Sequence, residues 1–149
     1  MLINLAMGLP VVLVCLLLQA VFTFWSVRYF TRRSQRDTTP SGDLARIRAL
    51  FVVMIVLVLG NFLQIMVWGI LFMGLGEFDE VYEAVYHSAV NFSSLGYGDV
   101  VMSRRWKLLG PLEAANGVLM FGLTGAALMA MLQQMIRSET DPAAPRHRP

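Results

Sequence analysis

Three long stretches of this chain contain no Asp, Glu, Lys or Arg: residues 1–27, 49–76 and 114–136. A charge at the centre of a bilayer is costly, and a helix needs about 20 mostly apolar residues to cross one. The chain is 56% hydrophobic and only 15% charged, whereas ordinary globular domains are about 25% charged. The pattern predicts an all-α membrane protein with three transmembrane helices, and it excludes a soluble enzyme of normal composition.

A fourth uncharged stretch, residues 84–98, is too short to cross a bilayer. Residues 79–93 are expected to form a short helix because acids occupy the first turn, while the glycines on either side of Tyr97 prevent the helix from continuing. Non-helical backbone at membrane depth is tolerated only where it is buried in protein or lines a water-filled path. We therefore expect a re-entrant segment, with a short helix at 79–93 and a loop at 94–98.

The two glycines of this loop, Gly96 and Gly98, explain what the loop can do. Successive carbonyl groups point at one axis when the backbone alternates between right-handed and left-handed conformations, and glycine enters the left-handed region at little cost. Four copies of residues 94–98 around an axis would then present rings of oxygen that replace the water shell of a monovalent cation. One chain supplies a quarter of each ring, so the expected assembly is a homotetramer.

The residues Ser94, Leu95, Gly96, Tyr97, Gly98 and Asp99 resemble the potassium-channel signature Thr-Val-Gly-Tyr-Gly-Asp, set between two spans as in small bacterial ion channels. The resemblance covers about residues 49–134 and implies a passive, potassium-selective channel with K⁺ as the permeant ion and no cofactor. Ser94 replaces Thr and Leu95 replaces Val or Ile. Both changes keep the carbonyl count, but they leave the strictness of K⁺ selectivity open.

The resemblance also assigns residues around the filter. Relatives often carry two Trp residues where this chain has Tyr86 and His87, so these residues and Asp99 are expected to support the filter. One hypothesis is that His87 hydrogen-bonds Asp99 or the Tyr97 hydroxyl and makes the filter pH-dependent. The alternative is that His87 is a packed aromatic side chain with no titration role.

Two residues of the third span, Glu113 and Gly117, also attract a functional interpretation. Gly117 lies where the family has a gating hinge, although a small residue there also allows close helix packing. Glu113 is expected near the outer pore mouth in an ion pair with Arg105 or a neighbouring cation. We expect no protein metal site, because His87, His147 and Cys15 lie too far apart. The formal charge of +2 does not indicate a nucleic-acid partner, and no soluble ligand is expected.

The predicted organisation is a peripheral transmembrane helix at 1–30, a basic cytoplasmic linker at 31–48, a pore domain at 49–136 and a disordered cytoplasmic tail at 137–149. Within the pore domain, the resemblance implies an outer helix at 49–76, a pore helix at 79–93, a filter at 94–98 and an inner helix at 112–136. Six Arg residues flank the first loop, against three basic residues between the later spans.

This asymmetry predicts a multi-pass protein of the bacterial inner membrane, with the N-terminus outside and the C-terminus in the cytoplasm. A non-conducting membrane interaction subunit and a weakly selective monovalent cation channel stay open as alternatives. The gating stimulus, the resting state and the role of the first span also stay open.

Overall fold

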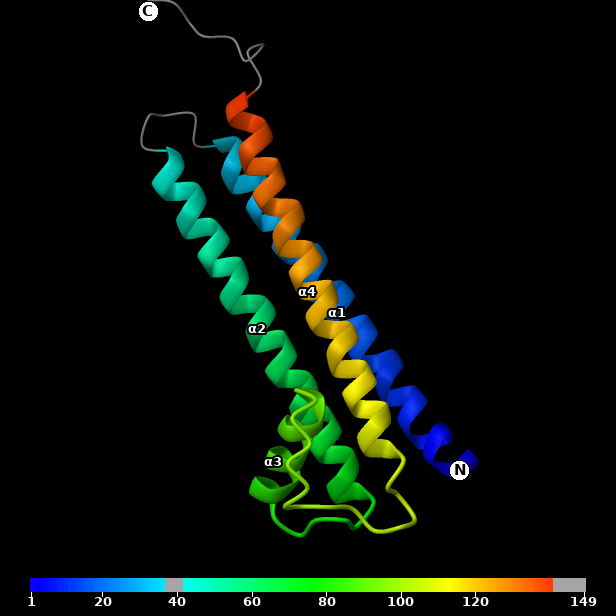
Figure 1. The fold of residues 1–149 in the computed structure, drawn as a ribbon. Helices are drawn as coiled ribbons and strands as arrows, with labels where there is room; N and C mark the ends of the chain where they lie inside the picture. The colour runs from blue at the N-terminus through cyan, green and yellow to red at the C-terminus, as the bar shows by residue number, and fades with distance from the viewer. Residues whose placement is uncertain (37–41, 141–149) are drawn as a thin grey trace, which may run out of the picture.

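The computed structural model describes residues 1–36 and 42–140, and in these ranges it contains helices and loops but no strands. The helices are α1 (Leu2–Arg36), α2 (Gly42–Gly74), α3 (Val81–Phe92) and α4 (Leu109–Thr140). The three long helices run side by side, and the short α3 lies at one end of the bundle (Figure 1). The N-terminus lies at the same end as α3, so the chain passes along the bundle three times.

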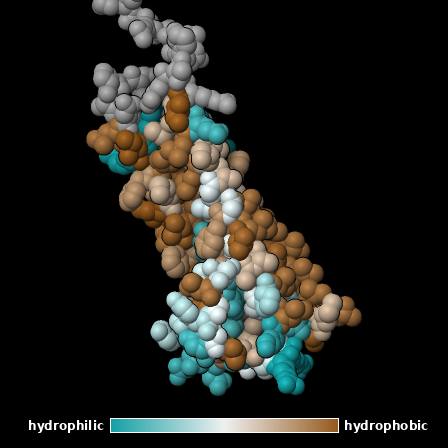
Figure 2. All heavy atoms as spheres, in the orientation of Figure 1, coloured by the Kyte–Doolittle hydropathy of each residue, from teal (hydrophilic) through white to brown (hydrophobic). Residues whose placement is uncertain are grey.

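Three segments of the long helices are long and apolar enough to cross a membrane: Leu2–Arg33, Leu44–Gly74 and Leu109–Ile136. Figure 2 shows hydrophobic surface along the long helices and hydrophilic surface gathered at the end that carries α3. Apolar side chains that face outward over most of a bundle's length are stable in lipid and not in water. The prediction of an all-α, multi-pass membrane protein is therefore confirmed.

The helices extend further than the sequence analysis predicts at the end of the bundle opposite α3. Helix α1 continues to Arg36 and α2 begins at Gly42, so much of the expected linker at 31–48 is helical; residues 37–41 lie outside the described residues. Helix α4 continues to Thr140, so the first residues of the expected tail are also helical, and 141–149 lie outside the description. Arg and Gln are good helix formers, so a helix does not need to end where its apolar run ends.

Helix α1 packs against both α2 and α4 through one narrow stripe. Its buried residues are spaced alternately by four and seven positions, which repeats every eleven residues and keeps them on one face. Most of them are small or polar, while large apolar side chains such as Leu13, Leu17 and Trp25 face outward. This pattern is typical of a helix that packs against others inside a membrane. The buried residues are Asn4, Gly8, Cys15, Gln19, Ser26 and Phe30.

Two glycines, one on α2 and one on α4, bring these long helices into close contact with α3. A Cβ atom on Gly117 of α4 would collide with the carbonyl oxygen of Phe92 in the last turn of α3. A Cβ atom on Gly69 of α2 would lie 3.4 to 3.5 Å from Val85 of α3. Phe92 is fully buried in the same apolar cluster as Trp68. Helix α3 therefore packs closely against both α2 and α4, which fixes where the following loop begins.

Candidate functional site

The loop that follows α3 alternates between left-handed and other backbone conformations. Ser94, Gly96 and Gly98 have φ angles of 60°, 59° and 76°, whereas Leu95 and Tyr97 do not have positive φ. The left-handed conformation was expected at the two glycines. It was not expected at Ser94, where a residue with a Cβ atom costs about 1–2 kcal/mol in this region.

Hydrogen bonds at the end of α3 explain the conformation of Ser94. The Leu95 N–H donates to the Val90 carbonyl at 3.0 Å, and the Ser94 N–H donates to the Asn91 carbonyl at 2.8 Å. These two bonds define a Schellman motif, in which the residue after the helix cap is left-handed. The first residue of the loop is thus held by the C-terminal cap of α3.

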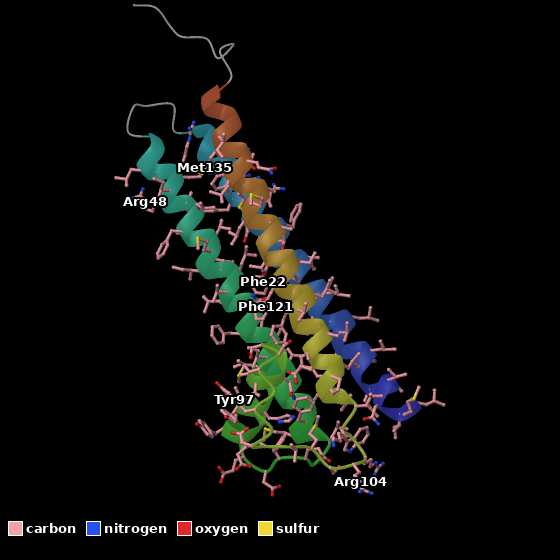
Figure 3. The ribbon with its side chains drawn as sticks, viewed as in Figure 1. Phe22, Arg48, Tyr97, Arg104, Phe121 and Met135 are labelled. Atoms are coloured by element: carbon pink, nitrogen blue, oxygen red, sulfur yellow. The ribbon has the colours of Figure 1, made fainter. Side chains whose placement is uncertain are left out.

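The loop is exposed along residues 93–99. Tyr97 has 68% and Leu95 has 59% of its surface exposed. Figure 3 shows Tyr97 next to α3, on the side of the bundle away from α1. The face of the loop is therefore uncovered within a single chain and free to meet other copies.

A hydrogen bond between Tyr86 and Asp99 connects the C-terminal end of the loop to α3. The Tyr86 hydroxyl donates a hydrogen bond of 2.6 Å to one carboxylate oxygen of Asp99, and the Val100 N–H donates to the other at 3.0 Å. The bond from Tyr86 lowers the pKa of Asp99 below its ordinary value, and the same bond raises the pKa of Tyr86. Asp99 is therefore a carboxylate that holds the end of the loop in place.

His87 lies beside this contact, but it does not hydrogen-bond Asp99 or the Tyr97 hydroxyl, so that hypothesis is wrong. Its Nδ1 lies 3.0 Å from the Val100 carbonyl oxygen, and its Nε2 lies 2.9 Å from the Asn91 amide nitrogen. A neutral ring that donates from Nδ1 and accepts at Nε2 satisfies both contacts. Because the ring is buried against Phe72 and Phe78, burial lowers the pKa of His87.

A second contact holds the segment after residues 94–98, and the sequence analysis missed it. The Glu77 carboxylate accepts hydrogen bonds of 2.6 Å from both the N–H and the hydroxyl of Ser103. These bonds join the loop before α3 to the segment that follows residues 94–98. Nothing in the local sequence pairs two residues this far apart, so only the fold identifies them.

The expected ion pair between Glu113 and Arg105 does not form. Glu113 is completely buried, and its Oε1 lies 2.5 Å from the Ser88 hydroxyl of α3. Arg105 is exposed, and its guanidinium lies 5.1 Å from the centre of the Trp106 ring. Glu113 lies about one turn into α4 and faces the interior of the bundle, whereas Arg105 lies in the loop before α4. Gly117, the candidate hinge, has a packing contact with Phe92, and its role as a hinge stays a prediction.

A buried polar network joins α1 to the other two long helices, and this network was also missed. The Gln64 amide donates to the Gln19 side-chain oxygen at 2.9 Å, and the Gln19 amide donates to the Thr124 hydroxyl at 3.0 Å. Asn61 also donates to Thr124 at 3.4 Å. Polar residues inside apolar spans commonly hydrogen-bond across helices, and that was the available signal.

A family model described as an ion channel matches residues 51–134, more than half of the chain. The chain therefore belongs to this ion channel family, and its function is ion passage and not catalysis. The match begins in α2, includes α3 and the loop at 94–98, and ends in α4, so α1 lies outside it. No curated protein and no solved structure matches the chain.

Proposed function

We propose that four copies of this chain form a passive, potassium-selective channel whose filter is built from residues 94–98. The observation that carries the proposal is the left-handed backbone at Ser94, Gly96 and Gly98, alternating with the residues between them. Alternation of this kind turns successive carbonyl groups toward one side of a chain. Four such chains around an axis would offer oxygen rings to a dehydrated K⁺ ion.

The position of α3 adds an electrostatic argument. The C-terminal end of a helix carries a partial negative charge, and α3 ends directly at the filter. Four such ends around one axis would lower the energy of a cation between them. They would act together with the carbonyl rings, through which adjacent ions move by mutual repulsion.

Exposed apolar side chains near the filter support assembly with further copies of the chain. A groove between α2, α3, the filter and α4 has an almost wholly apolar lining, which includes Phe62, Leu95, Tyr97 and Phe121. Phe121 has 45% and Val118 has 59% of its surface exposed, and both lie on the inner helix. Neighbouring copies that cover these side chains would close the ring around the filter.

The proposed orientation places the filter and the N-terminus outside a bacterial inner membrane. Figure 3 shows Arg48 and Arg104 at opposite ends of the bundle. Arg28, Arg32 and Arg33 accompany Arg48 at the end away from the filter, whereas Arg104, Arg105 and Lys107 lie at the filter end. The larger number of cations at the first end favours the cytoplasm for that end.

The proposal is tested with the purified full chain in liposomes that contain a K⁺ gradient. We expect K⁺ flux, a reversal potential in mixed K⁺ and Na⁺ that follows K⁺, and a native mass of four chains. A reversal potential that ignores the K⁺ gradient would favour the weakly selective channel. Absence of flux from a well-folded protein would favour the non-conducting interaction subunit.

A matched pair of glycine variants links any flux to the filter. Gly96→Ala places a Cβ atom at a φ of 59° and is expected to abolish most of the flux. Gly74→Ala, at the end of α2, has nothing within 4 Å of the added Cβ and is expected to conduct as the unmodified chain does. Equal flux from the two variants would show that ions do not pass through residues 94–98.

A further inference from the structure

Behind the pore helix, the structure buries a group of polar side chains that the filter does not use. Glu113 and Trp68 are completely buried, and Asn116 is 3% exposed. Within the described part of the chain, the Glu113 Oε2, the Trp68 Nε1 and both polar atoms of the Asn116 amide have no hydrogen-bond partner. The buried Cys15 thiol of α1 faces the same group, next to Asn116 and Trp68. A carboxyl group in such surroundings requires an explanation, because a buried unpaired charge is very costly.

The hydrogen bonds of Ser88 explain how the carboxyl group of Glu113 can be buried. The Ser88 Oγ lies 2.8 Å from the Ile65 carbonyl oxygen of α2 and 2.5 Å from the Glu113 Oε1 of α4. A serine hydroxyl has a single hydrogen to donate, and a carbonyl oxygen can only accept. If the Ser88 hydrogen goes to Ile65, the hydrogen between Ser88 and Glu113 must come from the carboxyl group. Both contacts are hydrogen bonds at the same time only when Glu113 is a neutral acid.

We propose that Glu113 is a positioning residue for the filter, which as a neutral carboxylic acid donates a hydrogen bond to Ser88 and so joins the inner helix to the pore helix. Ser88 in turn donates to the Ile65 carbonyl oxygen, so two consecutive hydrogen bonds link α4, α3 and α2. No charge is buried in this arrangement. The groups that face Glu113 are the hydroxyl of Ser88 and the side-chain amide of Asn91, both on α3, and the thiol of Cys15 on α1.

The consequence for the filter rests on the function proposed above. Ser88 lies in the middle of α3, and the cap at the end of that helix holds Ser94. Without the hydrogen bond from Glu113, the buried Ser88 oxygen would lose its donor, and the hydrogen-bonded link between α4 and α3 would be broken. The pore helix would then shift or fluctuate, and the carbonyl groups of the filter would move with it.

The protonation state is tested by infrared spectroscopy of the full chain in lipid, with ¹³C-labelled glutamate, at neutral pH. We expect the carbonyl stretch of a protonated carboxylic acid, which disappears in Glu113→Gln and persists in Glu80→Gln. Ser88→Ala should shift the band, because the acid loses its acceptor. A chain without the band, or a band unchanged in Glu113→Gln, would overturn the proposal.

The positioning role is tested by three variants in the liposome flux assay. Glu113→Gln keeps an N–H donor for Ser88 and should retain most of the K⁺ flux. Glu113→Leu and Glu113→Ala remove the donor, and we expect flux about tenfold lower. If Glu113→Leu conducts as well as Glu113→Gln, Glu113 does not position the filter. If the unmodified chain carries the infrared band but passes no K⁺, the proposed function fails while the neutral acid stands.

Discussion

Tyr86 and Asp99 lie on opposite sides of residues 94–98 in the sequence and are joined by a hydrogen bond of 2.6 Å. Tyr86 belongs to the second turn of α3, and Asp99 directly follows Gly98. The Schellman cap fixes the first residue of the loop, and this bond fixes the residue after the last. The short loop at 94–98 is therefore held at both ends by the same helix, α3.

Tyr86→Phe removes this bond and is expected to make the filter less durable, with K⁺ flux that declines faster during sustained conduction. It should also raise the pKa of Asp99 toward the ordinary value of 3.8, because the bond from Tyr86 is the main cause of the lowered pKa. A lowered pKa means that the contribution of the bond is present above the ordinary carboxyl pKa and is lost as the pH falls through the lowered one. An NMR titration of the Asp99 carboxyl carbon in the two proteins measures the difference. Identical titrations would show that the bond is absent in the membrane.

We expect His87 to make the stability of the fold depend on pH, with lower stability at lower pH. Burial lowers the pKa of His87 from its ordinary value of 6.5, so the folded state favours the neutral ring. Its contribution to the free energy of unfolding is then complete above the ordinary pKa and is lost as the pH falls through the lowered pKa. Thermal unfolding of the full chain should show a falling midpoint from about pH 7 to about pH 5. In His87→Phe, which keeps the contacts with Phe72 and Phe78, this part of the pH dependence should disappear; an unchanged slope would assign it to other groups.

Gly117→Ala is expected to destabilise the fold by about 1–3 kcal/mol, because the new methyl group overlaps the Phe92 carbonyl and must push α4 away from α3. Gly125→Ala is the matched control on the same helix, since nothing lies within 4 Å of its added Cβ. Equilibrium unfolding in detergent compares the two. A hinge without a packing role would give the reverse pattern, with altered open probability but equal stability of the two variants.

Thr124→Val tests the attachment of α1. The substitution keeps the shape of the side chain but removes the oxygen that accepts from Gln19 and Asn61, so the side-chain N–H groups of these two buried residues lose this acceptor. We expect a loss of about 0.5–2 kcal/mol in the free energy of unfolding. Thr23→Val is a control, because Thr23 makes no side-chain hydrogen bond within the described residues. Equal stability of the two variants would mean that the network does not hold α1.

The sequence by itself determined the membrane class, the three spans, the short helix between the second and third spans, and the left-handed glycines of the loop. These features depend on local chemistry: runs without charge, acids at a helix start, and residues that tolerate positive φ. The family match at residues 51–134 agrees with that reading of the pore region. The same local rules missed the left-handed Ser94, because its conformation depends on hydrogen bonds to a preceding turn.

Only the tertiary structure decided which polar side chains meet. Charge and position in the sequence suggested Arg105 as the partner of Glu113 and Asp99 as the partner of His87. In the structure, Glu113 instead hydrogen-bonds Ser88, and His87 hydrogen-bonds Val100 and Asn91. Asp99 hydrogen-bonds Tyr86. The rotation of each helix about its own axis selects these pairs, and that rotation is set by packing along the whole length of the helix. A short stretch of sequence does not determine this rotation. The motif at residues 94–99 could therefore be recognised directly, but the hydrogen bonds that hold it in place could not be predicted.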